Sequence, residues 1–191
     1  MDNFNPLIKR PNIRRRCVME KKIERAVFRD LSYGLYIVTS SSEGRLNGQV
    51  VNTVIQVTSE PPRVAVIINK KNLTHEFILK SKVFSASVLE ESTPMTFLGP
   101  FGFRSGRDID KLSRVAFKEG ITGCPLITEH ALSVLEAEVM DQIDLGTHTI
   151  FVGNVVRSEI LKKGPPLTYQ YYHQVLRGKS PPNAPTYEAK Q

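Results

Sequence analysis

The chain has 191 residues, of which 40% are hydrophobic, and it carries a net charge of +7. This length suits one domain with an extension, and the apolar content is sufficient for a core. No apolar run approaches the roughly 18 residues of a membrane span, no secretory signal is present, and the two cysteines, Cys17 and Cys124, stand far apart. We therefore expect a cytoplasmic protein with no membrane span, disulfide framework, zinc site or iron–sulfur cluster.

The positive charge is concentrated at the N-terminus. Residues 1–26 hold eight basic and three acidic side chains, so they carry +5 of the +7. An extension of this kind can bind nucleic acid or an anionic surface, or it can simply be solvated. Because the rest of the chain shows no basic stripe interleaved with aromatic residues, we expect no nucleic-acid partner. The extension is predicted to be flexible and then helical, and Met19 begins an alternative native start.

Hydrophobic periodicity predicts the elements of the chain in order. Strands are expected at residues 36–40, 45–57, 63–69, 83–89, 131–141 and 148–160. Helices are expected at residues 20–31, 72–79, 94–97, 110–115 and 168–176. Loops are expected at residues 99–107 and 121–125. Residues 131–141 could pass as a helix, but their pairing with the strand that follows favours a strand. Six strands, mostly joined as hairpins and without a βαβ rhythm, predict a mainly β fold, an antiparallel barrel with short peripheral helices.

The motifs of several enzyme classes are missing. No GxGxxG follows a strand and opens a helix, and the phrase GPFGFRSG does not have that context. There is neither a Walker A sequence nor a GxSxG elbow. The four histidines are scattered, and a structural role is the default for each of them.

Polar residues within an apolar strand mark the first candidate site. The stretch from Gly48 to Pro62 is rich in valine and isoleucine but also carries Asn52, Thr53 and Gln56. Such side chains let a sheet edge hydrogen-bond a flat polar ligand. A partly exposed strand with ordinary polar side chains would show the same pattern, so the strand alone leaves both interpretations open.

Two other segments favour an anion or a cofactor. Residues 69–72, with the sequence NKKN, lie between a buried strand and the start of a helix. Lysine charge, backbone N–H groups and the helix dipole suit a phosphate there, and Thr74 and His75 add donors. The loop at residues 103–107 holds more charge and hydroxyl groups than folding requires. A solvated loop would explain either segment as well.

Six sequence segments, or phrases, follow one another along the chain: YGLYIVTS, NGQVVNTVIQVTSEPPRVAVIINKKNLTHEFI, FSASVL, FGFRSGRDIDK, GCPLI and GTHTIFVGNVV. Together they resemble the flavin-reductase-like, FMN-binding split-barrel family, and most of all the NAD(P)H:flavin oxidoreductase module of high-molecular-weight rubredoxins. The resemblance covers residues 27–187. It implies a six-stranded Greek-key split barrel at residues 27–163, a C-terminal helix and proline-rich tail at residues 164–191, and a homodimer with FMN near the subunit interface.

The resemblance also implies site residues. The cofactor-binding set comprises Gln49, Val50, Val51, Asn52, Thr53, Gln56, Ser59, Asn69, Lys70, Thr74, His75, Phe101, Arg104 and Ser105. The strand residues would line the isoalloxazine and ribityl chain, and the segment from Asn69 to His75 would complete a phosphate site. His148 would lie near the reacting face, where it acts by position or charge rather than as an obligatory acid. No metal ligands are implied.

The implied activity is hydride transfer from the nicotinamide C4 of NADH or NADPH to flavin N5, which needs stacked rings rather than a strong acid or base. The paired CxxC motifs of rubredoxin are missing. The electron acceptor is therefore expected to be separate: free flavin, a redox protein, a metal chelate or oxygen. Two alternatives stay open. One is a flavoredoxin-like electron carrier that NAD(P)H does not reduce, and the other is a non-enzymatic FMN-binding barrel.

Overall fold

A computed structural model describes residues 23–187. The chain forms two compact units, of which one ends at Leu31 and the other begins at Ser32. In the first unit, the described residues form a 3₁₀ helix, η1 (Arg25–Asp30), where the sequence predicted an α-helix over residues 20–31. Most of the predicted basic extension lies outside the described residues.

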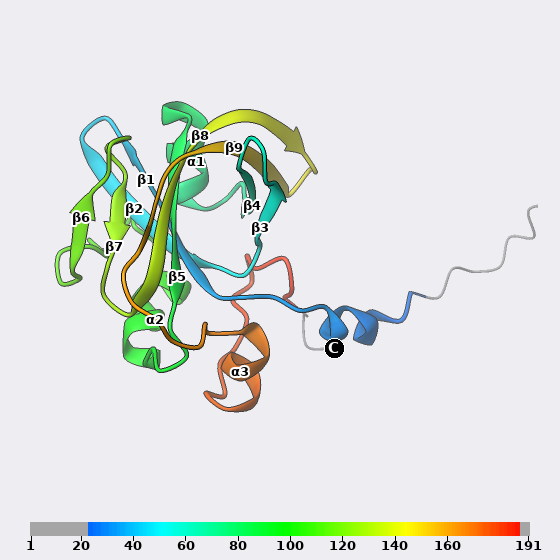
Figure 1. Ribbon diagram of the computed structural model, residues 1–191. Coiled ribbons are helices and arrows are strands. Elements are labelled where there is room, and N and C mark those ends of the chain that lie inside the picture. Colours follow the sequence, from blue (N-terminus) through cyan, green and yellow to red (C-terminus); the bar gives the residue numbers. More distant parts are fainter. Residues whose placement is uncertain (1–22, 188–191) are drawn as a thin grey trace, which may run out of the picture. The chain divides into compact units, whose positions relative to one another are not determined.

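The second unit is built on a seven-stranded antiparallel sheet with the strand order β2-β1-β5-β8-β9-β4-β3 (Figure 1). Its strands are β1 (Tyr36–Ser42), β2 (Arg45–Val51), β3 (Val54–Thr58), β4 (Arg63–Asn69), β5 (Val83–Leu89), β8 (Ala131–Asp144) and β9 (His148–Ile160). A separate hairpin pairs β6 (Phe117–Glu119) with β7 (Pro125–Ile127). The helices are α1 (Leu73–Ser81), α2 (Met95–Phe103) and α3 (Tyr169–Gln174). None of the helices in the described part of the chain is long and apolar enough to cross a membrane.

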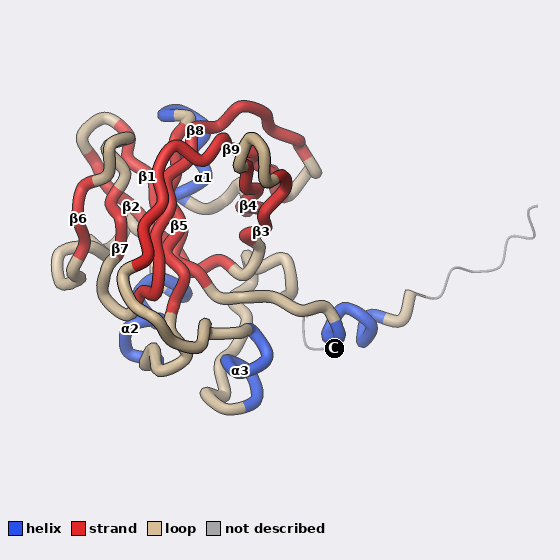
Figure 2. Tube along the Cα trace, in the orientation of Figure 1, coloured by secondary structure: helices blue, strands red, loops and turns tan. Residues whose placement is uncertain are grey.

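The connection between β2 and β3 shows that the sheet closes into a barrel. These two strands are the opposite edges of the sheet, yet only Asn52 and Thr53 separate them in the chain. Two residues span at most about 7 Å, so the sheet must curl until its edges meet. Figure 2 shows the strands curling in this way. The single strand predicted over residues 45–57 is therefore wrong, because the chain changes sheet edge at its middle.

Apolar side chains on the inner faces of the strands fill the barrel. Phe84, Phe151, Val66 and Ile68 are fully buried there, and Ile78 of α1 belongs to the same cluster. A second apolar cluster lies where α2 and α3 pack, around Ile37, Leu89, Leu98, Phe101 and Leu167. Alternation along the strands places every second residue inside, and α1 and α2 add further buried apolar side chains to the two clusters.

Three local predictions fail. Residues 110–115 form turns rather than a helix, and residues 121–125, predicted as loop, include the start of β7. Helix α2 continues to Phe103 through Gly99 and Pro100, where a loop was expected. Packing of Phe97, Leu98 and Phe101 into the core outweighs the weak helix propensity of glycine and proline. The predicted antiparallel barrel is confirmed, with nine strands among residues 23–187 in place of six.

Candidate functional site

A cavity of about 510 Å³ lies beside the crossing from β2 to β3. Its walls come from β2, the end of β4, the start of α1, the end of α2 with the loop that follows, and the C-terminal segment at residues 179–185. This size and mixture of apolar and polar walls are typical of a site for a small ligand or cofactor.

One end of the cavity is polar and tightly held. The side-chain Nδ2 of Asn47 donates to Oγ1 of Thr74 at 2.8 Å, which joins β2 to the first turn of α1. Gly106 packs against this pair, and a Cβ atom added there would lie 2.0 Å from Oδ1 of Asn47. A larger residue at position 106 would therefore displace Asn47 or the loop that carries Gly106. The N-terminus of α1 carries a partial positive charge and free N–H groups, so this end suits an anion.

The C-terminal segment closes the cavity from the side of α3. Two tyrosines on α3 hold it: Tyr172 donates through its hydroxyl to the carbonyl of Lys179 at 3.0 Å, and the Tyr169 hydroxyl bonds Ser180. Nδ2 of Asn183 donates to Oδ1 of Asn72 at 3.0 Å, which ties the segment to the start of α1. We call residues 179–185 the strap. The strap therefore forms the wall of the cavity on the side of α3.

Nine of the fifteen predicted site residues line this cavity. They come from three segments that are far apart in the chain: Gln49, Val50, Val51 and Asn52; Asn69 and Thr74; Phe101, Arg104 and Ser105. The fold therefore brings together strand, helix start and loop in the way that the resemblance implied. Whether these residues bind a cofactor stays a prediction.

The other six predicted residues do not line the cavity. Gln56 and Ser59 are exposed on β3 and the turn after it. Thr53 is buried, and its hydroxyl donates to the carbonyl of Ile67 at 3.1 Å, so it fixes β4 at the crossing. Lys70 forms an ion pair with Asp144 at 2.6 Å, and its hydrogen bond lowers the pKa of that carboxyl group.

The two predicted histidines flank the cavity without lining it. His75 is buried, and its Nε2 lies 2.9 Å from Oγ1 of Thr149; burial lowers its pKa below the ordinary value. His148 begins β9 opposite Asn69, with its Nε2 3.4 Å from Nδ2 of that residue. Since Asn69 does line the cavity, His148 contacts the wall of the cavity through Asn69.

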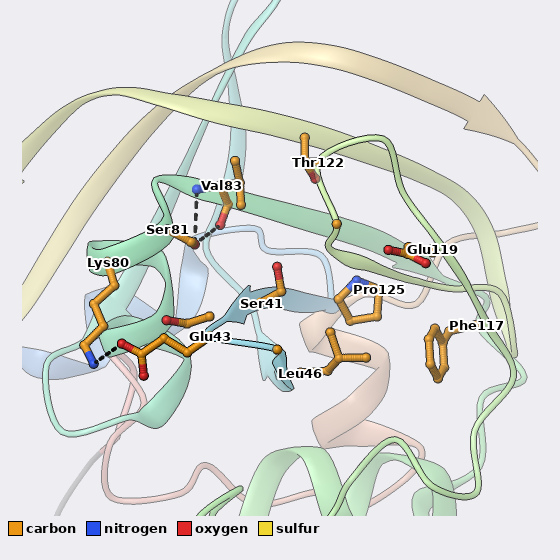
Figure 3. Close-up of a pocket in the computed structure, with 13 residues that line it drawn as sticks. Ser41, Glu43, Leu46, Lys80, Ser81, Val83, Phe117, Glu119, Thr122 and Pro125 are labelled. Atoms are coloured by element: carbon orange, nitrogen blue, oxygen red, sulfur yellow. Dashed lines mark hydrogen bonds and ion pairs between the residues drawn. The ribbon is translucent and has the colours of Figure 1, made fainter.

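A second cavity, of about 720 Å³, lies between the β1–β2 turn, the end of α1 and the β6–β7 hairpin (Figure 3). Its charged side chains face solvent, and Lys80 pairs with Glu43 across it at 3.5 Å. None of the fifteen predicted site residues lines it. The cavity beside the β2–β3 crossing is therefore the candidate site.

Comparison with known proteins agrees with this geometry. The family model described as "Flavin reductase like domain" matches residues 28–177, which is most of the chain. The chain belongs to the flavin reductase like family. The predicted family and fold class are confirmed, and with them the predicted class of enzyme, an oxidoreductase of the flavin reductase type.

Three members of the flavin reductase like family illustrate the match. A protein named ferric-chelate reductase (NAD(P)H), from Archaeoglobus fulgidus, is 51% identical over 84% of this chain and 95% of that protein. High molecular weight rubredoxin from Moorella thermoacetica is 50% identical over 82% of this chain and 69% of that protein. The solved structure of flavin reductase HpaC complexed with NADP+ superposes with a TM-score of 0.66 at 27% identity, covering 76% of this chain and 90% of that one.

Sequence reasoning missed several residues that line the candidate site. They are Asn47, Lys111, Tyr169, Tyr172 and the strap. Lys111 stood in a segment predicted as a helix, and burial of its amine lowers its pKa to about 8. The prolines of the strap were a usable signal, since an extended proline-rich segment after a helix can run across a neighbouring surface. Nothing in the sequence indicated that it covers the site.

Replacing His148 by alanine should slow reduction by nicotinamide more than it weakens flavin binding. His148 contacts Asn69 but not the cavity, so its loss changes the position of a lining residue and the local charge without removing a wall. Stopped-flow reduction and a flavin dissociation constant measure the two effects separately. The opposite pattern, a weak flavin complex with an unchanged reduction rate, would make His148 a flavin ligand.

Proposed function

We propose that the chain is an FMN-dependent NAD(P)H:acceptor oxidoreductase whose FMN lies in the cavity beside the β2–β3 crossing. One observation carries this proposal: a single cavity collects nine predicted flavin-binding residues from three separate segments. The family-level oxidoreductase class supports it, as do the NAD(P)H and NADP+ in the names of two relatives.

The walls of the cavity fit the parts of FMN. The polar end at Asn47 and Thr74 lies at a helix N-terminus, whose partial positive charge and N–H groups suit a phosphate. The strand residues Val50 and Val51 give an apolar wall with backbone donors and acceptors, which suits a flat polar ring. FMN would supply the chemistry of accepting a hydride from the nicotinamide and passing electrons on.

The protein's own part in the reaction is to bind, orient and exclude water. Strand β2 is fixed on both sides, by β1 along its length and by Asn47 at α1, so the wall it offers is rigid. The strap excludes solvent from the α3 side through its bonds to Tyr169, Tyr172 and Asn72. A fixed, partly dry site holds two rings at reacting distance without an acid or base.

The homodimer remains part of the proposal, and the outer face of the sheet supports it. Cross-strand pairing places Ile67, Ile150 and Ile143 in one row across β4, β9 and β8, with Ile55 and Val152 in the next row. We call these five residues the outer apolar face. Ile55 and Ile143 are exposed, and contiguous apolar surface of this kind marks a protein contact.

A second copy of this chain is the occupant that fits the outer apolar face. Ile67 belongs both to this face and to the cavity wall, so a partner seated on the face would also border the cofactor. This agrees with the resemblance, which implied a cofactor near the subunit interface. A cytoplasmic location and a separate electron acceptor are also proposed, on the sequence arguments given above.

An anaerobic titration tests the function. The purified protein, loaded with FMN, is titrated with NADH and with NADPH while the flavin absorbance band is followed. We expect bleaching by at least one nicotinamide and recovery of the band on adding ferric chelate, free flavin or oxygen. Bleaching only by dithionite or by a partner protein would instead establish an electron carrier. Failure to take up FMN at all would refute both functions.

A further inference from the structure

Lys111 is a buried amine in the wall of the candidate site. Its residue is 8% exposed, and Nζ donates to the carbonyl oxygen of Gly48 at 2.9 Å. A lysine ammonium has three donors, and within residues 23–187 no ion pair joins it to a carboxylate. A buried charge without a counter-charge is costly, so the position calls for an anion that the protein itself does not provide.

The contacts of Lys111 place it at the polar end of the cavity. Its partner Gly48 follows Asn47, which is bonded to Thr74 in the first turn of α1. Gly106 packs against Asn47 and Leu73 at the same point. Lys111, the N-terminus of α1 and the loop after α2 therefore converge on one end of the cavity, and all three favour negative charge.

We propose that Lys111 is the charged partner of the FMN phosphate and that this pairing couples FMN binding to the uptake of a proton in mildly alkaline solution. The inference rests on the proposed function, since it requires FMN in this cavity. Lys70, the lysine that the sequence favoured for the phosphate, pairs with Asp144 and does not line the cavity.

The coupling follows from two pKa values of the same amine. Burial lowers the pKa of Lys111 to about 8 in the protein without ligand. A phosphate monoester is mostly a dianion above pH 7, because its second pKa is about 6, and a dianion beside the amine favours its charged form. The Lys111 pKa is therefore higher in the FMN complex than in the free protein. At a pH between these two pKa values, the free protein has lost the proton and the complex keeps it. FMN affinity should therefore fall above pH 8, by up to about tenfold per pH unit.

The other titratable or charged groups near the site differ from Lys111 in the pH range where they titrate or in their exposure. A binding experiment can therefore distinguish their effects from that of Lys111. The pKa of His75 is lowered by burial and by Lys70, so it titrates below this window. The pKa of Tyr172 is raised above its ordinary value of 10 by burial, so it titrates above the window. Lys71, Arg104, Asp108 and Lys179 also line the cavity, but they are exposed and stay present in every variant compared.

The test measures dissociation constants for FMN and for riboflavin, which has the same ring and no phosphate, from pH 7 to pH 9.5. In the native protein we expect FMN affinity to fall above pH 8 and riboflavin affinity to stay level. Lys111→Met should weaken FMN about 10- to 100-fold at pH 7, remove the pH dependence and leave riboflavin unchanged within about threefold. Calorimetry at pH 8.5 in two buffers of different ionisation enthalpy should show proton uptake by the native protein only.

Two further variants keep the test decisive. Lys111→Gln retains a donor to the Gly48 carbonyl, so it separates loss of charge from loss of folding, and riboflavin binding reports an intact cavity. Lys70→Met is the matched control and should change FMN affinity by less than about threefold. A larger effect of Lys70→Met than of Lys111→Met, equal weakening of both flavins by Lys111→Met, or an unchanged FMN constant would each overturn the inference. If the native protein binds neither flavin, the proposed function fails instead.

Discussion

Replacing Gly106 by alanine should weaken FMN binding about 5- to 150-fold. The added Cβ would lie 2.0 Å from Oδ1 of Asn47 and 3.2 Å from Cδ2 of Leu73, so either the loop or Asn47 must move. Forcing a methyl group into a packed site costs about 1–3 kcal/mol, which corresponds to the stated range of dissociation constants. Moving Asn47 would also break its bond to Thr74 and open the polar end of the cavity. Quenching of flavin fluorescence measures the effect.

Gly102→Ala is the matched control for this change. Gly102 also lines the cavity, but a Cβ there would meet only Val50, at 4.0 Å, which is ordinary contact. We expect its FMN affinity to stay within about threefold of the native value. Thermal unfolding of both variants shows whether the backbone tolerates each methyl group. If the two variants bind FMN equally well, Gly106 does not border the bound cofactor.

Replacing Ile143 by aspartate should dissociate the proposed homodimer. Ile143 lies in one row with Ile67 and Ile150 on the outer apolar face, and it is 50% exposed in the single chain. A carboxylate within an apolar interface would be buried without a partner, which costs about 2 kcal/mol or more and weakens association about thirtyfold or more. Sedimentation velocity over a range of protein concentrations measures the shift from dimer to monomer.

Ile121→Asp provides the control for that experiment. Ile121 is 67% exposed, but it lies in the turn between β6 and β7 and is not one of the five residues of the outer apolar face. Its replacement should leave the association constant unchanged. Because Ile67 also lines the cavity, Ile143→Asp should in addition weaken FMN binding at protein concentrations where the dimer is lost. A dimer that persists in Ile143→Asp would show that the interface is elsewhere.

Residue patterns were sufficient for most of the fold. Strands β4 and β5 begin and end where alternation and flanking turn residues indicated, and β9 begins at His148 and ends at Ile160 as predicted. These strands carry their information locally, since every second side chain must be apolar to face the core. The break at Asn52 and Thr53 could not be predicted, because it depends on which edge of the sheet each half of the segment joins.

The site was predicted less completely, for a related reason. Asn52 and Thr74 were indicated by polar residues in a strand and at a helix start, and the resemblance to a known family added Phe101. Lys111 was not predicted, although it ends one of the shared phrases, because a single lysine between Asp110 and Leu112 has the pattern of a solvated side chain, and only the packing of the loop buries it. The strap was likewise invisible, since its bonds to Tyr169, Tyr172 and Asn72 join residues whose pairing no local pattern specifies.

The two-residue crossing from β2 to β3 also bears on how the protein folds. The two residues of the crossing keep the ends of β2 and β3 close at every stage, whereas the pairings β1–β5, β5–β8 and β4–β9 join segments far apart in the chain. Pairings of this second kind are non-local, and folds that depend on them form slowly. The cavity takes its walls from β2, β4, α1, α2 and residues 179–185, so it exists only once these distant segments have assembled. Flavin uptake is therefore a reporter of the assembled barrel.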